Sequence, residues 1–169
     1  ATDPSGSTRA LYVVDNDAYA GSVHAKMECV ACHTSITDSV ASHQIAPNAA
    51  KVDCAQCHVD LWEDAKRNNQ TQEKIRLGIV AKNVSAYEKS YHARANKDDP
   101  SKVNATCNDC HNVHAFNVPL RGTDERKEWH LTVPKVCGQC HEEELADWTA
   151  SVHGQEATEN HNLKSAVCS

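Results

Sequence analysis

The sequence predicts a mainly α fold, in which short helices are joined by much irregular loop and no substantial sheet forms. No stretch of useful length alternates apolar and polar residues as a strand would. Several segments instead repeat apolar residues at helical spacing. The 169 residues include one Phe, three Trp and four Tyr, which are few of the side chains that usually dominate a core. We therefore expect a single domain, 1–169, whose interior is not built from its own side chains alone.

The longest predicted helix extends from Asp60 to Tyr91, in two pieces. Ile75 and Ile79 belong to its apolar stripe, and Gly78 weakens its middle. A shorter helix is expected to follow Thr123 or Asp124, either of which can cap a helix start.

A second long helix is predicted from Glu142 to His153. Leu145 and Trp148 fall on one face of it, and three glutamates occupy its first turn, where acidic groups suit the helix dipole. Gly154 is placed to cap its C-terminus. Two segments are expected to be loops: Ala46 to Val52 and Asp98 to Thr106.

Four copies of Cys-x-x-Cys-His carry the strongest chemical signal in the chain. The pattern is typical of c-type haem attachment, in which two thiols add to the haem vinyl groups and the adjacent histidine becomes the proximal iron ligand. Zinc ribbons also use Cys-x-x-Cys pairs, but they do not require a histidine directly after each pair. We therefore expect four covalently bound haems, around which the short helices wrap. The thioether cysteines are Cys29, Cys32, Cys54, Cys57, Cys107, Cys110, Cys137 and Cys140, and the proximal histidines are His33, His58, His111 and His141.

A ninth cysteine, Cys168, lies outside the four motifs. It follows His153 by fifteen residues, as Cys107 follows His92 by fifteen, and both histidines stand in a Ser-x-His sequence. Cys168 is therefore expected to be the first cysteine of a fifth haem motif, in a gene that continues or in a fragment. The alternative is a true C-terminus with a thiol that pairs between chains.

A two-haem unit recurs along the chain and organises it. Each unit begins with Ser-x-His, continues to a first haem motif, and reaches a second motif after His-x-x-x-Pro and Lys-Val. The spacings differ between the units, which indicates a decayed duplication. The predicted parts are unit one at 22–62, a helical connection at 63–89, unit two at 90–148 and the start of a third unit at 149–169.

Seven of the eleven histidines are outside the motifs, which is enough to give each iron a second axial imidazole. Matching positions in the two units assign four of these distal ligands, and His153 would serve a fifth haem. His114, three residues after its own motif, is a candidate ligand of a neighbouring haem, whereas His161 is expected to be solvated. Bis-histidine haems of low potential are expected, since Met27 is badly placed to bind iron. The four matching histidines are His24, His43, His92 and His130.

The net charge of −6 argues against nucleic acid as a partner. It favours redox partners with basic docking patches, although such a charge also keeps a protein soluble. No stretch of about 18 apolar residues is present to span a bilayer. Because the chain starts at Ala1 and c-type haem is attached outside the energy-conserving membrane, we expect an exported periplasmic or extracellular protein whose signal peptide has been removed.

Nearly the whole chain resembles the multihaem c-type cytochromes of bacterial and archaeal respiration. The resemblance rests on the four haem motifs, on Cys107 to His114 with Phe116 close behind, and on Pro134 to Gly154, which ends in Ser-Val-His-Gly. It implies haems packed in close pairs and a chain of irons along which electrons hop. Some members of this family polymerise into extracellular filaments and exchange ligands between subunits, which would make other copies of this chain its partners.

An electron carrier with no substrate chemistry is therefore the expected function, passing electrons between redox proteins or along a filament. The alternative is a multihaem oxidoreductase that reduces a small nitrogen or sulfur oxyanion at one open haem. Such enzymes often mark that haem with a changed motif, such as Cys-x-x-Cys-Lys, and none occurs here. The surplus of histidines also argues against an open iron, so no catalytic residue is expected.

Overall fold

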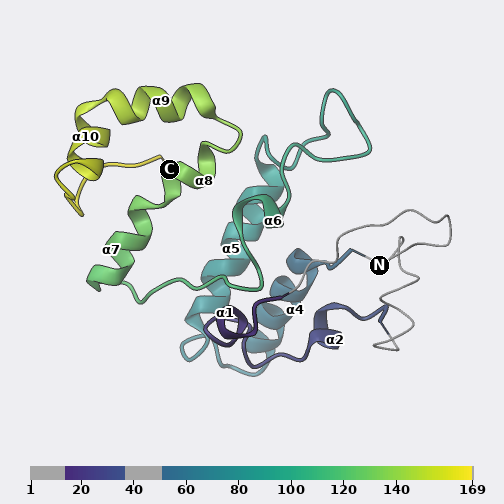
Figure 1. The fold of residues 1–169 in the computed structure, drawn as a ribbon. Helices are drawn as coiled ribbons and strands as arrows, with labels where there is room; N and C mark the ends of the chain where they lie inside the picture. Colours follow the sequence, from purple (N-terminus) through teal and green to yellow (C-terminus); the bar gives the residue numbers. More distant parts are fainter. Residues whose placement is uncertain (1–13, 37–50, 169) are drawn as a thin grey trace. The chain divides into compact units, whose positions relative to one another are not determined.

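The computed structural model describes residues 14–36 and 51–168, which are mainly helical (Figure 1). Within these ranges the β structure is a single isolated antiparallel bridge, Ala95–Val103. The predicted mainly α class without a substantial sheet is therefore confirmed. The described helices are α1 (Asn16–Ala20), α2 (Cys29–Cys32), α4 (Cys54–Arg67), α5 (Ile75–Lys89), α6 (Cys107–Cys110), α7 (Asp124–Leu131), α8 (Val133–Cys137), α9 (Glu142–Ala150) and α10 (Val152–Thr158).

The described chain divides into two compact units, which are not the same as the two-haem repeat units of the sequence. The first unit contains α2, α4 and α5 and runs from Lys26 to Asp109. The second contains α1 and α7 to α10 and combines Asp15–Ala25 with the chain from Cys110 onward. An early segment of the sequence thus packs with residues that follow the third haem motif.

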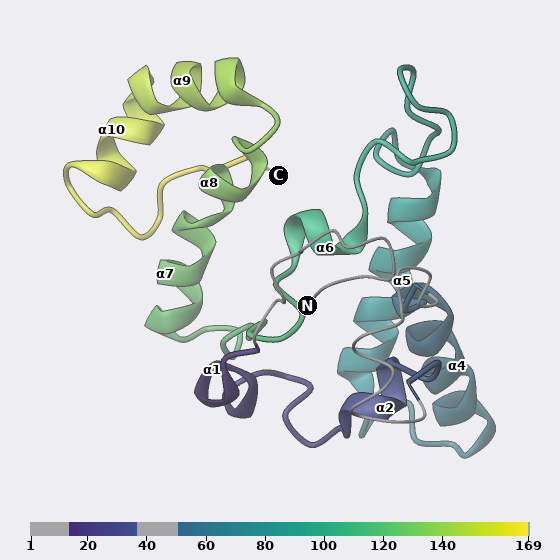
Figure 2. The same ribbon diagram turned by 45° about the vertical axis from the view of Figure 1, so that its right-hand side comes forward.

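Helices α4 and α5 pack against each other in the first unit (Figure 2). They correspond to the helix predicted in two pieces from Asp60 to Tyr91, but α4 begins earlier, at Cys54, and α5 ends at Lys89. The break falls at the end of α4, where Asn69 adopts a left-handed φ of 56°. The Asn69 N–H donates to Lys66 O at 3.2 Å and the Gln70 N–H donates to Ala65 O at 2.8 Å. This pair of bonds is a Schellman motif, which satisfies the last carbonyls of α4 and ends the helix.

Gly78, which the sequence indicated as a weak point, lies inside α5 without breaking it. A Cβ atom built on Gly78 would lie 2.9 Å from ring carbons of Trp62. Glycine is therefore needed at this position so that α5 can approach the indole ring on α4, which offsets its low helix propensity.

The predicted helix from Glu142 to His153 is wrong at its C-terminus. Helix α9 ends at Ala150, Ser151 is extended with ψ near 162°, and a new helix, α10, begins at Val152. The Ser151 side chain causes the break because it caps the new helix, accepting a bond from the Gly154 N–H at 3.2 Å. Gly154 is thus buried inside α10 and does not cap α9. A Cβ on Gly154 would overlap the backbone of α9.

The shorter predicted helix is present as α7, with Thr123 accepting a bond from the Arg126 N–H at 3.2 Å as its cap. The loop expected at 98–106 is also present; apart from the bridge residue Val103 it has neither helix nor strand. Of the loop expected at 46–52, Lys51 and Val52 are described and have neither helix nor strand, while the rest lies outside the described residues. None of the helices described is long and apolar enough to cross a membrane.

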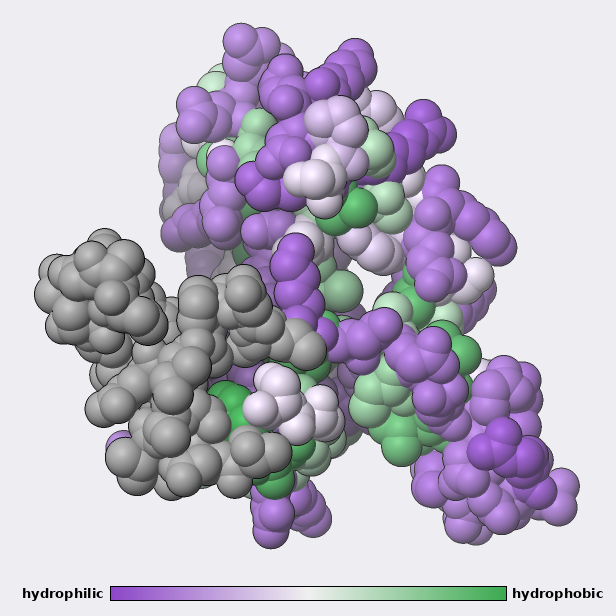
Figure 3. Space-filling model, turned by 90° about the vertical axis from the view of Figure 1, so that its right-hand side faces the viewer, coloured by the Kyte–Doolittle hydropathy of each residue, from purple (hydrophilic) through white to green (hydrophobic). Residues whose placement is uncertain are grey.

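The polypeptide of the described ranges buries very little apolar surface. Its buried hydrophobic residues are Ala65 and Ala157, and Pro134 is the largest residue that is fully buried. By contrast, Ile75 is 57 % exposed and Val152 is 72 % exposed. Figure 3 shows hydrophobic residues reaching the surface among hydrophilic ones on one face. Since a fully buried aliphatic side chain contributes about 1.5–3 kcal/mol, these exposed ones add little to folding.

The Schellman motif predicts different effects on stability for two substitutions at Asn69. Asn69→Ala should lower the free energy of unfolding by about 1 kcal/mol, because alanine disfavours a positive φ. Asn69→Gly should leave stability unchanged or slightly higher, because glycine adopts this conformation freely. Urea denaturation of the haem-loaded protein measures both, and equal effects of the two variants would contradict the assignment.

Candidate haem-attachment sites

The first and fourth Cys-x-x-Cys-His motifs share one backbone bond. The His33 N–H donates to Cys29 O at 2.9 Å, and the His141 N–H donates to Cys137 O at 3.0 Å. The two histidines have similar backbone angles, with ψ of 59° and 61°. Residues three and four apart in such a helical turn lie on the same side of it. Two thiols and an imidazole can therefore meet one flat group.

The second and third motifs are also held in helical turns. Helix α4 starts at Cys54, and its cap, the Asp53 carboxylate, accepts a bond from the Gln56 N–H at 2.8 Å. Helix α6 holds the third pair of thiols, and Asp109 within it accepts bonds from Thr106 N and Oγ1 at 2.6 and 2.8 Å. These Thr106 donors hold the pKa of Asp109 below its usual value. Each of these two motifs thus has a local polar anchor for its helical turn.

Thiols from the first three motifs come together within the first unit. The pKa of Cys54 is raised by burial, and further by the neighbouring thiols of Cys107 and Cys32. Cys54 and Cys107 are close enough for a side-chain hydrogen bond. Burial and then Cys32 also raise the pKa of Cys57. Segments far apart in the sequence therefore bring the thiols of their motifs close together.

A matching pair of thiols lies in the second unit. The pKa of Cys137, in the fourth motif, is raised by burial and then by the nearby thiol of Cys168. None of the nine cysteines forms a disulfide, and each is partly or fully exposed.

The proximal histidines of the third and fourth motifs have identifiable neighbours. The His111 ring packs edge-on against Phe116, with ring centroids 4.3 Å apart. Burial lowers the pKa of His111, which favours the neutral imidazole that binds iron. His141 Nδ1 lies 3.7 Å from a Glu144 carboxylate oxygen, on the side where carboxylates orient metal-binding histidines.

Two candidate distal histidines, His24 and His114, lie in one small cluster of the second unit. The Val23 N–H donates to Phe116 O at 2.9 Å, so the Ser-x-His segment pairs with the chain after the third motif. His24 Nδ1 lies 3.4 Å from Val113 O. The His114 ring centroid is 6.4 Å from that of Tyr19, whose hydroxyl donates to His24 O at 2.9 Å. Both imidazoles are thus held beside the segment that carries His111.

The remaining candidate distal histidines that the structure describes lie on other elements. His92, His130 and His153 are exposed, on the loop after α5, on α7 and on α10. The His92 carbonyl accepts a bond from the Ala105 N–H at 2.9 Å, two residues before Cys107. His43 lies outside the described residues. The structure therefore connects His92 with the residues just before Cys107, in the first compact unit.

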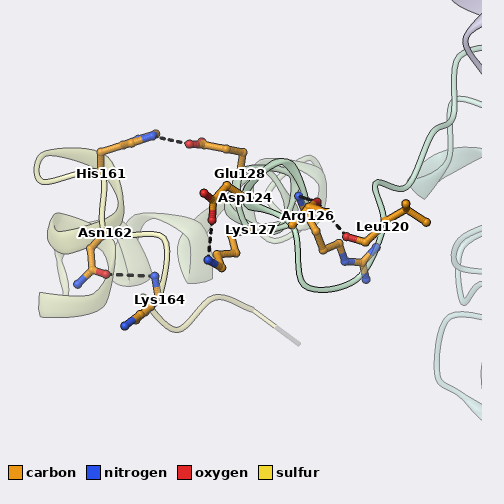
Figure 4. A network of polar contacts seen from close by, with 9 residues as sticks. Leu120, Asp124, Arg126, Lys127, Glu128, His161, Asn162 and Lys164 are labelled. Atoms are coloured by element: carbon orange, nitrogen blue, oxygen red, sulfur yellow. Dashed lines mark hydrogen bonds and ion pairs between the residues drawn. The ribbon is translucent and has the colours of Figure 1, made fainter.

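His161, which we expected to be solvated, is exposed and paired with a carboxylate. Its Nε2 lies 2.8 Å from Glu128 Oε1, and the two side chains point toward one another (Figure 4). The pair connects α7 with the segment after α10. Both residues line a pocket of about 290 Å³, together with Leu131, Trp148 and Ala157. An exposed pair of this kind contributes at most about 1 kcal/mol.

Sequence reasoning missed an aromatic residue three positions before each Ser-x-His. Tyr19, Tyr87 and Trp148 occupy these places, and each uses its polar tip to donate to a backbone carbonyl. The signal was available, because alignment of the three copies gives aromatic-x-x-Ser-x-His each time. Asp53 and Glu144 were also missed, since capping and orienting carboxylates have no fixed spacing from a haem motif.

No protein-family model, curated protein or solved structure matches this chain. In the described ranges, no group of three His, Cys, Asp or Glu side chains is arranged to hold a bare metal ion.

The residues present fit a covalently attached haem on two grounds. Each motif sets two thiols and an imidazole on or beside one helical turn, which is the donor set that c-type haem requires. Large apolar side chains such as Leu61 and Ile79 are exposed, so a large apolar group could cover them.

The Asp53 cap predicts a stability effect at the second motif. Asp53→Ala should lower the free energy of unfolding of the haem-loaded protein by about 1 kcal/mol, because the Gln56 N–H loses its acceptor. Asp53→Asn is the matched control and should retain stability, since asparagine caps equally well. Thermal and urea denaturation measure the difference; a loss in both variants would point to the charge of Asp53 and not to its cap.

Proposed function

We propose that this protein is an electron carrier that holds c-type haems at its four Cys-x-x-Cys-His motifs and passes electrons among them. The convergence of thiols from the first three motifs carries the proposal. Haems bonded to Cys32, Cys54 and Cys107 would be attached at neighbouring points of one unit. Electron tunnelling falls steeply with the distance between cofactor edges, so this arrangement favours transfer from haem to haem.

Each haem supplies an iron that alternates between two oxidation states, and the chain supplies ligands and surroundings. His33, His58, His111 and His141 would bind the irons on the proximal side. His24 is the best-supported distal ligand, because a backbone carbonyl beside Nδ1 favours the tautomer whose Nε2 binds metal. Bis-histidine ligation would keep the irons six-coordinate and the potentials low.

The proposed setting is outside the cytoplasm, where c-type haem is attached, with other redox proteins as donors and acceptors. The negative net charge suits partners that present basic patches. Transfer between copies of this chain in a filament is a narrower form of the same proposal.

Haem counting tests the proposal directly. The native protein should be coloured and should weigh at least four haems more than its polypeptide, and reduction should take at least four electrons per chain. Intact-mass measurement and a spectroscopic redox titration check both numbers. A colourless protein with the mass of its bare polypeptide would rule the proposal out.

The ligation state of the irons separates a carrier from a reductase. Electron paramagnetic resonance of the oxidised protein should show low-spin haems throughout, and nitrite or carbon monoxide should leave the spectra unchanged, because no iron has an open position. A high-spin signal that responds to nitrite would instead support an oxyanion reductase.

A further inference from the structure

Two turns of the chain, one in each unit, share an unusual set of hydrogen bonds. At the end of α5, Ser90 N and Oγ both donate to Tyr87 O, at 2.8 and 2.7 Å. At the end of α9, Ser151 N and Oγ both donate to Trp148 O, at 3.0 and 2.6 Å. Both serines are extended, with ψ of 169° and 162°. The same local device therefore ends both helices just before a Ser-x-His histidine.

The aromatic side chains of these turns also make matching long-range contacts. Tyr87 Oη donates to Ala105 O at 2.7 Å, and Trp148 Nε1 donates to Ala166 O at 3.0 Å. Both contacts span eighteen residues. In each case the accepting carbonyl is two residues before a cysteine, Cys107 in the first unit and Cys168 in the second. Each aromatic side chain thus holds in place the backbone just before one of the two cysteines.

The two cysteines have corresponding neighbours, although only the first pair is close enough for a hydrogen bond. Cys107 lies beside Cys54, the first cysteine of the preceding haem motif. Cys168 lies beside Cys137, which is again the first cysteine of the preceding motif. This thiol pairing is a separate observation from the hydrogen bonds of the turns.

Ser165, three residues before Cys168, adds an independent indication of a bound group. The residue is only 8 % exposed, and its Oγ has no hydrogen-bond partner among the described residues. A buried hydroxyl without a partner is unfavourable, because it has given up its hydrogen bonds to water. A carboxylate of a bound group, such as a haem propionate, would supply the missing acceptor.

We propose that Cys168 is a haem-attaching thiol, positioned beside the fourth haem as Cys107 is positioned beside the second. The inference rests on the proposed function of the four complete motifs. The attachment adds the Cys168 S–H across a haem vinyl group: Sγ bonds to one vinyl carbon, the hydrogen ends on the other, and the C=C π bond is consumed. This addition is balanced and needs no oxidant or reductant. His153 is the candidate axial ligand of this further haem.

Alkylation followed by peptide mass spectrometry tests the inference on the full native protein. The protein is denatured, treated with iodoacetamide and digested, and the peptides that contain Cys107 and Cys168 are compared. The expected result is haem on both peptides, with neither cysteine alkylated. A haem-free preparation is the control and should show alkylation of all nine cysteines, which proves that the reagent reaches Cys168.

The outcomes separate this inference from the function on which it rests. Haem on the Cys107 peptide with an alkylated or disulfide-bonded Cys168 overturns the inference and leaves the four-haem carrier intact. Alkylation at all four motifs overturns both. Haem on the Cys168 peptide establishes the site.

Discussion

The shortage of large buried side chains is the constraint on which the rest of this molecule depends. In the described ranges Ala65, Ala157 and Pro134 are buried, while Leu61, Ile75 and Ile79 on the helices are exposed. Ordering a chain costs conformational entropy that small buried residues cannot offset. Apart from α4 and α5 the described helices are short, and caps and turns fix the connections, so further apolar contacts would have to come from a bound group. The proposed covalent haems would provide them, and the cofactor would then belong to the fold as well as to the function.

Much of the fold could be predicted because helix periodicity and turn residues act locally. The two-piece helix and the short helix after Thr123 follow from spacing and capping alone. The exact breaks could not be predicted, since they depend on bonds that compete with helix propensity. Gly78 was expected to weaken a helix but is tolerated against Trp62, whereas Ser151 interrupts one by capping the next.

The sequence could identify only those candidate site residues whose chemistry requires a fixed spacing. Cys-x-x-Cys-His places two candidate thiols and a candidate proximal histidine within five residues, so the sequence alone is enough to propose them. Distal ligands depend on which segments meet in space. The pairing of Ser22–His24 with the chain after the third motif joins residues about ninety positions apart, and no local pattern indicates it. The thiol clusters were hidden for the same reason.

The second and third Ser-x-His sequences are followed by spans of equal length but different structure before the next cysteine. Between His92 and Cys107 the chain forms a projecting loop with one β bridge, and between His153 and Cys168 it forms most of α10 and a turn. In both spans a hydrogen bond from an aromatic side chain joins the two ends. The residues between the ends are therefore not needed to position the cysteine. Substitutions or insertions in the middle of either span could therefore accumulate during evolution, or add a new binding loop, without moving the cysteine that follows.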